Sequence, residues 1–134
     1  MANNLQLAYN SVNVEADALS DLLDNGYLRI YDAPQPASAG VAISTQLLLA
    51  ELRFNATAAP SAALGVLTMG AFTADASANL TGTAAWFRAL KSDGSTVVFD
   101  GTVGTSLSDL NLNTVAIVIS ATVSVTAMTY TVAK

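Results

Sequence analysis

Apolar and polar positions alternate along much of the chain, and clusters of small residues, Pro and Gly interrupt them, which predicts a β-rich protein. Residues 27–32, YLRIYD, alternate in this way and end at a Pro-Gln-Pro sequence, because proline has no N–H to donate to a neighbouring strand. Residues 37–45 are small and polar and predict a loop. Residues 46–54 are dense in leucine and fit either a buried strand or a helix. We expect a strand, because Pro60 and its small neighbours leave little room for a long helix.

The strongest local signal is a hairpin in the segment AAWFRALKSDGSTVVFDG. Two β-prone runs flank Asp93-Gly94, a pair suited to the positive φ angles of a tight turn. A second pair, Asp100-Gly101, predicts a further turn shortly afterwards.

The remaining strands complete the predicted fold class. Residues 64–72 mix two glycines with apolar side chains and predict an irregular or bulged strand. Residues 114–133 contain two β-branched runs and predict two more strands. Strands at such spacing favour an all-β domain, an antiparallel sandwich or jelly-roll-like barrel, and the length of 134 residues fits a single domain over residues 1–134.

The N-terminal segment, residues 1–12, allows two interpretations. Leu5, Leu7 and Tyr9 recur at period two, which suits a half-buried strand or an extended arm that lies on a neighbouring subunit. These three residues are the candidate intersubunit contacts.

One short helix is predicted over residues 14–24. Asn13 is a suitable N-cap, three leucines share one face, and Asn25-Gly26 is a suitable stop. The acidic residues of this segment are expected to form a solvated helix face rather than a cation site. They are Glu15, Asp17, Asp21 and Asp24.

The composition excludes many kinds of active site, because the chain contains no histidine and no cysteine. It therefore has no imidazole or thiolate for a nucleophilic relay, for a His- or Cys-ligated zinc site, or for a redox pair. We expect a protein that is not an enzyme and needs no cofactor or metal.

The sequence also argues against membranes and nucleic acids as partners. The N-terminus lacks the basic and apolar regions of a secretory signal, and the longest strongly apolar run, residues 115–119, is far shorter than the roughly 18 residues of a membrane span. The five basic residues are scattered, whereas a nucleic-acid surface gathers them. A soluble protein made in the cytoplasm is expected.

The aromatic residues Trp86, Phe87 and Phe99 have two possible uses. Packing in the core and between strands is the common one, and a ligand platform is the other. In the second case the protein is a small carbohydrate-binding module, with Trp86 or Tyr31 stacked on a sugar.

The most informative property is a shortage of charge. Charged residues make up 11% of the chain, against about 25% in ordinary domains, while Ala, Thr, Ser and Gly are abundant. Much of the surface must then be neutral, which suits a subunit covered by copies of itself or by a larger assembly. A soluble monomer carried by Ser, Thr and Asn is the alternative.

Several segments resemble a family of small proteins encoded among the head genes of tailed bacteriophages and prophages. They are LQLAYNSVNVEADALSDLLDNGYLRIYD, LLLAELRF, GTAAWFRALKSDGSTVVFDGTVGTS and DLNLNTVAIVISATVSVTAMTYT. The resemblance implies a virion structural protein, similar to the decoration or cement proteins that bind major capsid protein on the outside of the head. It transfers no functional residue.

From the resemblance and the charge shortage we expect a homo-oligomer, with a trimer as the first choice, located on the capsid surface. Another head, connector or tail component remains the structural alternative.

Overall fold

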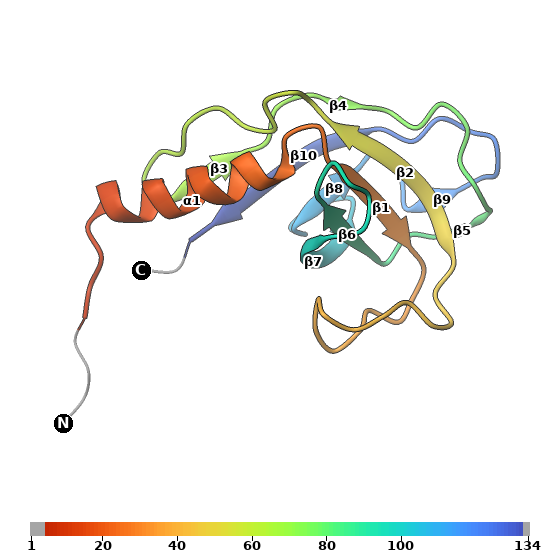
Figure 1. Ribbon diagram of the computed structural model, residues 1–134. Coiled ribbons are helices and arrows are strands. Elements are labelled where there is room, and N and C mark those ends of the chain that lie inside the picture. Colours follow the sequence, from red (N-terminus) through yellow and green to blue (C-terminus); the bar gives the residue numbers. More distant parts are fainter. Residues whose placement is uncertain (1–4, 133–134) are drawn as a thin grey trace.

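A computed structural model of the protein describes residues 5–132 and shows a mostly β fold with one short helix (Figure 1). The fold-class prediction is confirmed to this extent. The elements are α1 (Tyr9–Leu23), β1 (Tyr27–Tyr31), β2 (Leu48–Phe54), β3 (Val66–Thr68), β4 (Phe72–Thr73), β5 (Gly82–Thr83), β6 (Trp86–Leu90), β7 (Val97–Gly104), β8 (Leu110–Leu112), β9 (Ala116–Ile117) and β10 (Val125–Thr131).

Eight strands form one sheet in the order β3-β10-β8-β7-β6-β1-β2-β4, and β5 pairs separately with β9. The pairings are antiparallel except that of β7 with β8, which is parallel. The sheet is therefore mixed, and the prediction of a purely antiparallel one is wrong. The reason is the short crossover after β7, which brings β8 alongside in the same direction.

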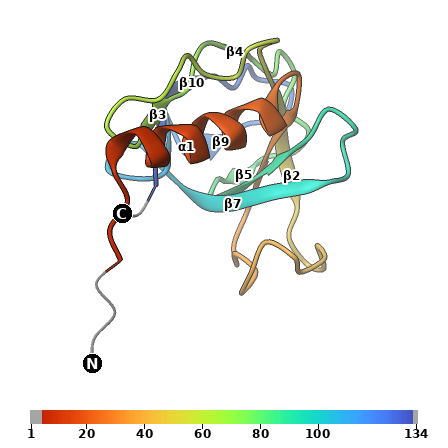
Figure 2. The same cartoon turned by 60° about the vertical axis from the view of Figure 1, so that its left-hand side comes forward.

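The sheet curls strongly, because its two edge strands are close neighbours in the sequence. Only residues 69–71 separate β3 from β4, and a chain extends at most about 3.6 Å per residue, so the edges approach within roughly 14 Å. Two backbone hydrogen bonds hold the junction, from Met69 N to Met128 O (3.0 Å) and from Gly70 N to Ala58 O (2.9 Å). The result is a half-barrel (Figures 1 and 2).

The apolar core fills the inside of this curl. Leu28 on β1 is paired with Leu52 on β2 and with Ala89 on β6, and Ile30 is paired with Phe87. All five side chains are essentially inaccessible to solvent. Full burial of a large apolar side chain stabilises the fold by about 1.5–3 kcal/mol, so this layer is the main source of stability. The helix adds Val12, Ala16 and Leu23.

Helix α1 begins at Tyr9, earlier than predicted. Its N-cap is Ala8, whose backbone is extended and whose side chain makes no capping hydrogen bond. Asn13 lies inside the helix, and its side-chain oxygen accepts a hydrogen bond from Gly65 N at 2.8 Å. Asn13 therefore binds a neighbouring loop instead of capping the helix.

The strand predicted within residues 1–12 is wrong where the structure describes this segment. Residues 5–8 belong to no helix or strand, and residues 9–12 are helical. The alternation at period two covers only a few residues. Val12 and Ala16, by contrast, are four residues apart and both buried in the core, and this helical spacing decides the conformation. Residues 1–4 lie outside the described residues.

The predicted helix stop at Asn25-Gly26 is confirmed. Asn25 adopts φ 57°, in the left-handed region that suits a helix end. A Cβ at Gly26 would lie 2.3 Å from the carbonyl oxygen of Leu90, so no larger residue fits there.

The strands are mostly placed as predicted. β1 and β2 confirm the strands expected over residues 27–32 and 46–54, and β9 and β10 lie within the two C-terminal runs. The irregular strand expected over residues 64–72 is two short strands, β3 and β4, at opposite edges of the sheet. β8 was not predicted, because three residues, LNL, give too little pattern.

The turn predicted at Asp100-Gly101 is wrong, because both residues lie inside β7. Asp100 pairs across the sheet with Arg88, and Gly101 pairs with Phe87. A Cβ at Gly101 would lie 2.6 Å from the Phe87 ring. This glycine therefore permits a close approach within the sheet and does not mark a turn.

The predicted hairpin is confirmed, with β6 and β7 antiparallel and Gly94 at φ 71° in the connecting loop. The loop is closed by hydrogen bonds from Lys91 N to Thr96 O (2.9 Å) and from Gly94 N to Lys91 O (3.0 Å). The Asp93 carboxylate accepts the N–H groups of Ser95 and Thr96. Both residues of the Asp93-Gly94 pair thus act in the turn.

Replacing Gly94 with Val should destabilise the protein by about 1 kcal/mol or more, because an L side chain rarely adopts a positive φ. The measurement is the free energy of unfolding from a urea titration. The matched control is Gly40→Val, since Gly40 has no positive φ and a Cβ there meets nothing within 4 Å. Equal losses in the two variants would contradict the turn geometry.

The side-chain hydroxyl of Thr96 and the nearby N–H groups lower the pKa of Asp93 from 3.8 to about 2. A lowered pKa means that this carboxylate stabilises the fold above pH 3.8, and that the contribution is lost as the pH falls towards 2. Thr96→Val should raise the pKa of Asp93 towards 3.8 in an NMR titration of the carboxyl carbon. An unchanged pKa would exclude the Thr96 hydroxyl as the main cause.

Candidate functional site

Most charged side chains of the described residues are used inside the molecule. Eight of the ten acidic residues accept a hydrogen bond from a backbone N–H or from an arginine. All three arginines donate to a protein acceptor. Most of the scarce charge is thus engaged in hydrogen bonds within the protein, although the carboxylates of Asp93 and Asp109 still face solvent.

One face of α1 binds the loop that precedes β3. Asp24 accepts the N–H of Ala58 (2.8 Å) and Asp17 accepts the N–H of Ala62 (2.6 Å), in line with the bond from Gly65 to Asn13. These two aspartates are half-buried and bind the loop, whose N–H groups need acceptors, so they do not belong to a fully solvated acidic face. The two remaining acids of the helix, Glu15 and Asp21, are exposed.

A row of four charged residues crosses the outer face of the sheet. Glu51, Arg29, Arg88 and Asp100 are paired in that order on β2, β1, β6 and β7. Arg88 binds Asp100 through two hydrogen bonds of 2.8 Å, and each side chain is only 5% exposed. Donating these hydrogen bonds to Asp100 raises the pKa of the Arg88 guanidinium above its usual range. Arg29 binds Glu51 at 2.6 Å in a more exposed position.

The aromatic residues beside this row are structural. Trp86 is fully buried and stacks on Tyr31 with ring centroids 4.7 Å apart, and its Nε1 donates to the carbonyl oxygen of Asp32. Burial raises the pKa of Tyr31, against the opposing effect of the nearby arginines. Neither ring offers a face to a sugar, so the stacking role considered for Trp86 and Tyr31 is wrong. Phe87 is likewise buried in the core.

The third arginine stabilises the start of β1. The Arg53 guanidinium lies 4.0 Å from the centre of the Tyr27 ring and donates to the Tyr27 hydroxyl and to the carbonyl oxygens of Asn25 and Gly26. It closes the junction between the helix and the sheet.

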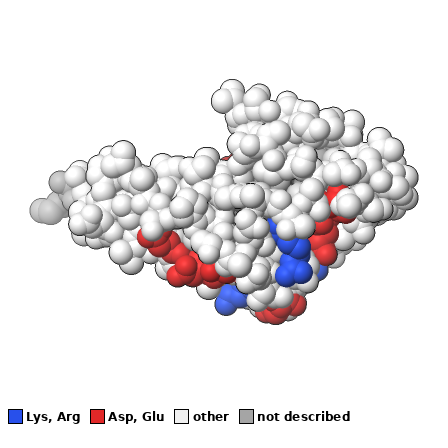
Figure 3. All heavy atoms as spheres, turned by 90° about the horizontal axis from the view of Figure 1, so that it is seen from above, with Lys and Arg blue, Asp and Glu red and all other residues white. Residues whose placement is uncertain are grey.

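Long stretches of the surface carry no charge. Residues 33–50 and 110–133 contain no Asp, Glu, Lys or Arg, and residues 54–87 contain only Asp75. Figure 3 shows the consequence: in this view the charged groups gather along one side, and most of the visible surface is uncharged. The predicted neutral surface is thus present on this face of the molecule.

The candidate arm lies at the end of the molecule where α1 begins. Residues 5–8 lead away from the body in both Figures 1 and 2. Leu5 is 88% exposed and Tyr9 46% exposed, while Leu7 is partly covered. The structure therefore leaves two of the three predicted contact residues largely accessible.

Two exposed leucines were missed by the sequence analysis. Leu64 and Leu107 adopt φ 52° and 54°, and Leu107 is fully exposed. Left-handed backbone is unusual for leucine and concentrates at functional positions. Only the glycine that follows Leu64 gave any sequence signal of a turn.

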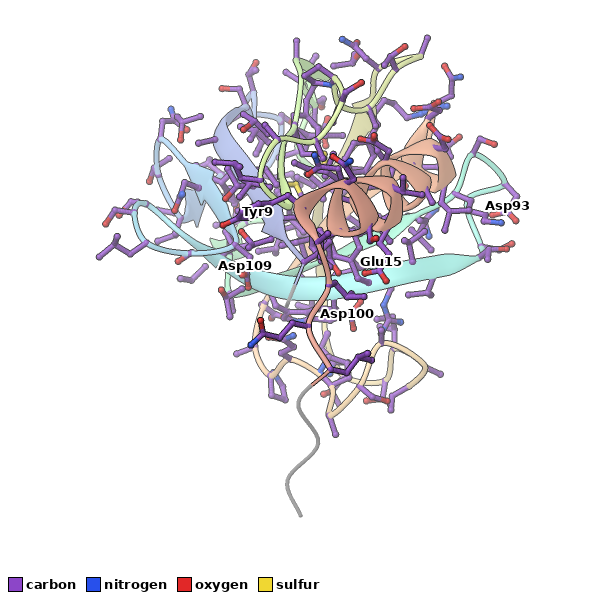
Figure 4. The ribbon with its side chains drawn as sticks, turned by 90° about the vertical axis from the view of Figure 1, so that its left-hand side faces the viewer. Tyr9, Glu15, Asp93, Asp100 and Asp109 are labelled. Carbon is purple, nitrogen blue, oxygen red and sulfur yellow. The ribbon has the colours of Figure 1, made fainter. Side chains whose placement is uncertain are left out.

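A crevice of about 410 Å³ opens between β7 and β10, with Leu107 at its margin. Phe99 and Tyr130 line it and contact each other with ring centroids 5.8 Å apart. Asp100 and Asp109 also line it. Figure 4 faces this end of the molecule and shows both aspartates together with Tyr9.

Two general classes of site find no support in the described part of the chain. Residues 5–132 contain no group of three or more Asp or Glu side chains placed to hold a metal ion, and no helix there could span a membrane.

Comparisons with protein-family models, curated proteins and solved structures give no match.

The buried ion pair gives a testable result. Arg88→Met should destabilise the protein by about 3–5 kcal/mol in urea unfolding, because it leaves the Asp100 carboxylate buried and unpaired. The double variant Arg88→Met/Asp100→Leu should recover much of that loss. Arg29→Met is the matched control, and loss of its exposed pair with Glu51 should cost about 1 kcal/mol or less. Equal losses for the two single variants would contradict the expected difference between the buried pair and the exposed pair.

Proposed function

We propose that this protein is a decoration, or cement, protein of a tailed bacteriophage or prophage. It binds the outer surface of the head at junctions between major capsid protein subunits and stabilises the shell. It acts as a homo-oligomer, with a trimer as the first choice, because three equivalent contacts match a threefold junction. Its role is mechanical and involves no catalysis.

The observation that carries this proposal is the neutral surface. A free monomer generally has a well-charged surface, whereas most charges here hold loops and strands together. Burying a neutral surface in an interface with another protein is favourable, because no charge has to be removed from water. A standard interface buries about 1,600 Å² of surface. Many copies on one shell turn a modest individual affinity into a large total stabilisation.

Two protruding segments suit contact with a shell. The loop over residues 33–47 and the arm over residues 5–8 both extend on the lower side in Figures 1 and 2. Neither contains a charged residue. The loop exposes three apolar side chains, Val41, Ile43 and Leu47.

The proposed fold is a jelly-roll-like sandwich in which β5 and β9 form part of the second layer. Ile117 of β9 is buried in the core, and Gly82 of β5 packs against the Leu49 side chain of β2. These contacts support a small second layer over the half-barrel.

The other candidate functions have weaker support. A different head, connector or tail position would use the same neutral surface, so it is an outcome of the test below. A carbohydrate-binding module loses its aromatic platform, since Trp86 and Tyr31 are buried.

Purified protein should bind expanded heads that lack it and raise the temperature at which they release DNA or disassemble. Because the contacts are neutral, occupancy should change little between about 0.05 and 0.5 M salt. Occupancy is measured by gel densitometry of sedimented heads and heat resistance by light scattering. Protein lacking residues 1–8, which keeps α1 complete, reports on the arm separately.

If heads neither bind the full-length protein nor gain heat resistance, the cement role is wrong. A connector or tail role then becomes the better account. A steep loss of occupancy with salt would show charged contacts and contradict the neutral interface.

A further inference from the structure

The crevice between β7 and β10 exists because the strand between them is short. β8 pairs with β7 only at Val103 and Gly104, and it pairs with β10 only as far as Met128. Beyond these points β7 and β10 separate, and within residues 5–132 no strand fills the space between them. The floor is apolar and aromatic, with Phe99 edge-on to Phe87.

One wall of the crevice is an open strand edge. Val103 N donates to Ala85 O on the β6 side, whereas Thr102 N points the other way and donates to the Asp109 carboxylate. Since alternate residues of a strand direct their N–H groups to opposite sides, the Asp100 N–H also points to the crevice side. Such an edge can accept an added extended segment.

The margin of the crevice exposes an apolar side chain. Leu107 is fully exposed on left-handed backbone, so the fold holds an apolar side chain in water at this position. Exposed apolar groups beside an open strand edge are typical of a site that another segment covers.

The arm has the properties of that segment. Residues 5–8 are uncharged, extended at Ala8 and long enough to span about 13 Å as a strand. Leu5 and Leu7 recur at period two, so both point to the same face of an extended segment. Tyr9, at the start of α1, and the crevice residues Asp100 and Asp109 are seen on the same side of the molecule in Figure 4, so the arm and the crevice lie at the same end.

We propose that the crevice between β7 and β10 receives the N-terminal arm of a second copy of this chain. The arm adds to the open edge of β7 as a short strand, and Leu5 and Leu7 cover the apolar floor beside Phe99 and Tyr130. The arm of the same chain leads away from the body, so the contact is made between subunits. This inference rests on the homo-oligomer of the proposed function and assigns its contact.

The test uses the absence of cysteine from the chain. One protein carries Leu5→Cys and the other carries Thr129→Cys, a crevice position. After mixing, a short bismaleimide can join the two different chains only in trans. The control pair is Leu5→Cys with Val118→Cys, which lies just after β9 at the other end of the molecule and is 55% exposed.

The expected result is a joined product in the crevice pair and little in the control pair. A second measurement is sedimentation equilibrium without capsids. Deletion of residues 1–8 removes two leucine contacts and should weaken self-association by about 100-fold or more.

A monomer at all concentrations, or equal products in the two pairs, overturns the inference. An oligomer that does not depend on the arm also overturns it and leaves the cement proposal standing, because the subunits then use another surface. Joining in the crevice pair by a protein that does not bind heads supports the arm contact and removes only the cement role.

Discussion

The structure depends on carboxylates that supply acceptors for backbone N–H groups in irregular segments. More than half of the described chain lies outside helices and strands, and buried or half-buried N–H groups there need partners. Asp17 and Asp24 bind N–H groups of the loop before β3. Asp75 and Asp109 lie in irregular segments themselves and tie them to strands, by accepting the N–H groups of Glu51 on β2 and Thr102 on β7. Without these contacts the loops would have no fixed path between the short strands.

The same use of charge shapes the outside of the molecule. Each carboxylate bound to a backbone N–H or to an arginine is one less group for contact with a partner, and the Ala-, Ser- and Thr-rich segments add no charge. The same hydrogen bonds therefore stabilise the fold and leave few charged groups available to a partner. This explains why a sequence so poor in charge can still build a polar network, as in the Arg88–Asp100 pair.

The sequence predicted those features whose cause is local. Period two in β1, the Asp-Gly turn between β6 and β7 and the Asn-Gly helix stop depend on a few adjacent residues. Features set by distant contacts were missed or misread. Asp100-Gly101 has the local form of a turn, but Arg88 and Phe87 on the neighbouring strand hold it straight. Helix α1 starts early because Val12, at the end of its otherwise exposed first turn, is buried in the core.

Part of the candidate site could likewise be predicted from the sequence, and part of it could not. The alternation that marked Leu5, Leu7 and Tyr9 is visible in the sequence, and two of these side chains are largely exposed. The crevice was not predictable, because it arises where β8 ends too early to keep β7 and β10 together. The left-handed backbone of Leu107 depends likewise on the path of the chain between β7 and β8.

The proposed arm contact and the proposed shell contact would reinforce each other. Subunits held at neighbouring or shared junctions have a high local concentration, so an arm that already joins free subunits occupies its crevice more completely there. By linkage, a filled crevice raises the affinity of both subunits for the shell by the same factor. Cooperative attachment then follows from neutral contacts alone, and a protein with few free charges can bind a large surface tightly without long-range attraction.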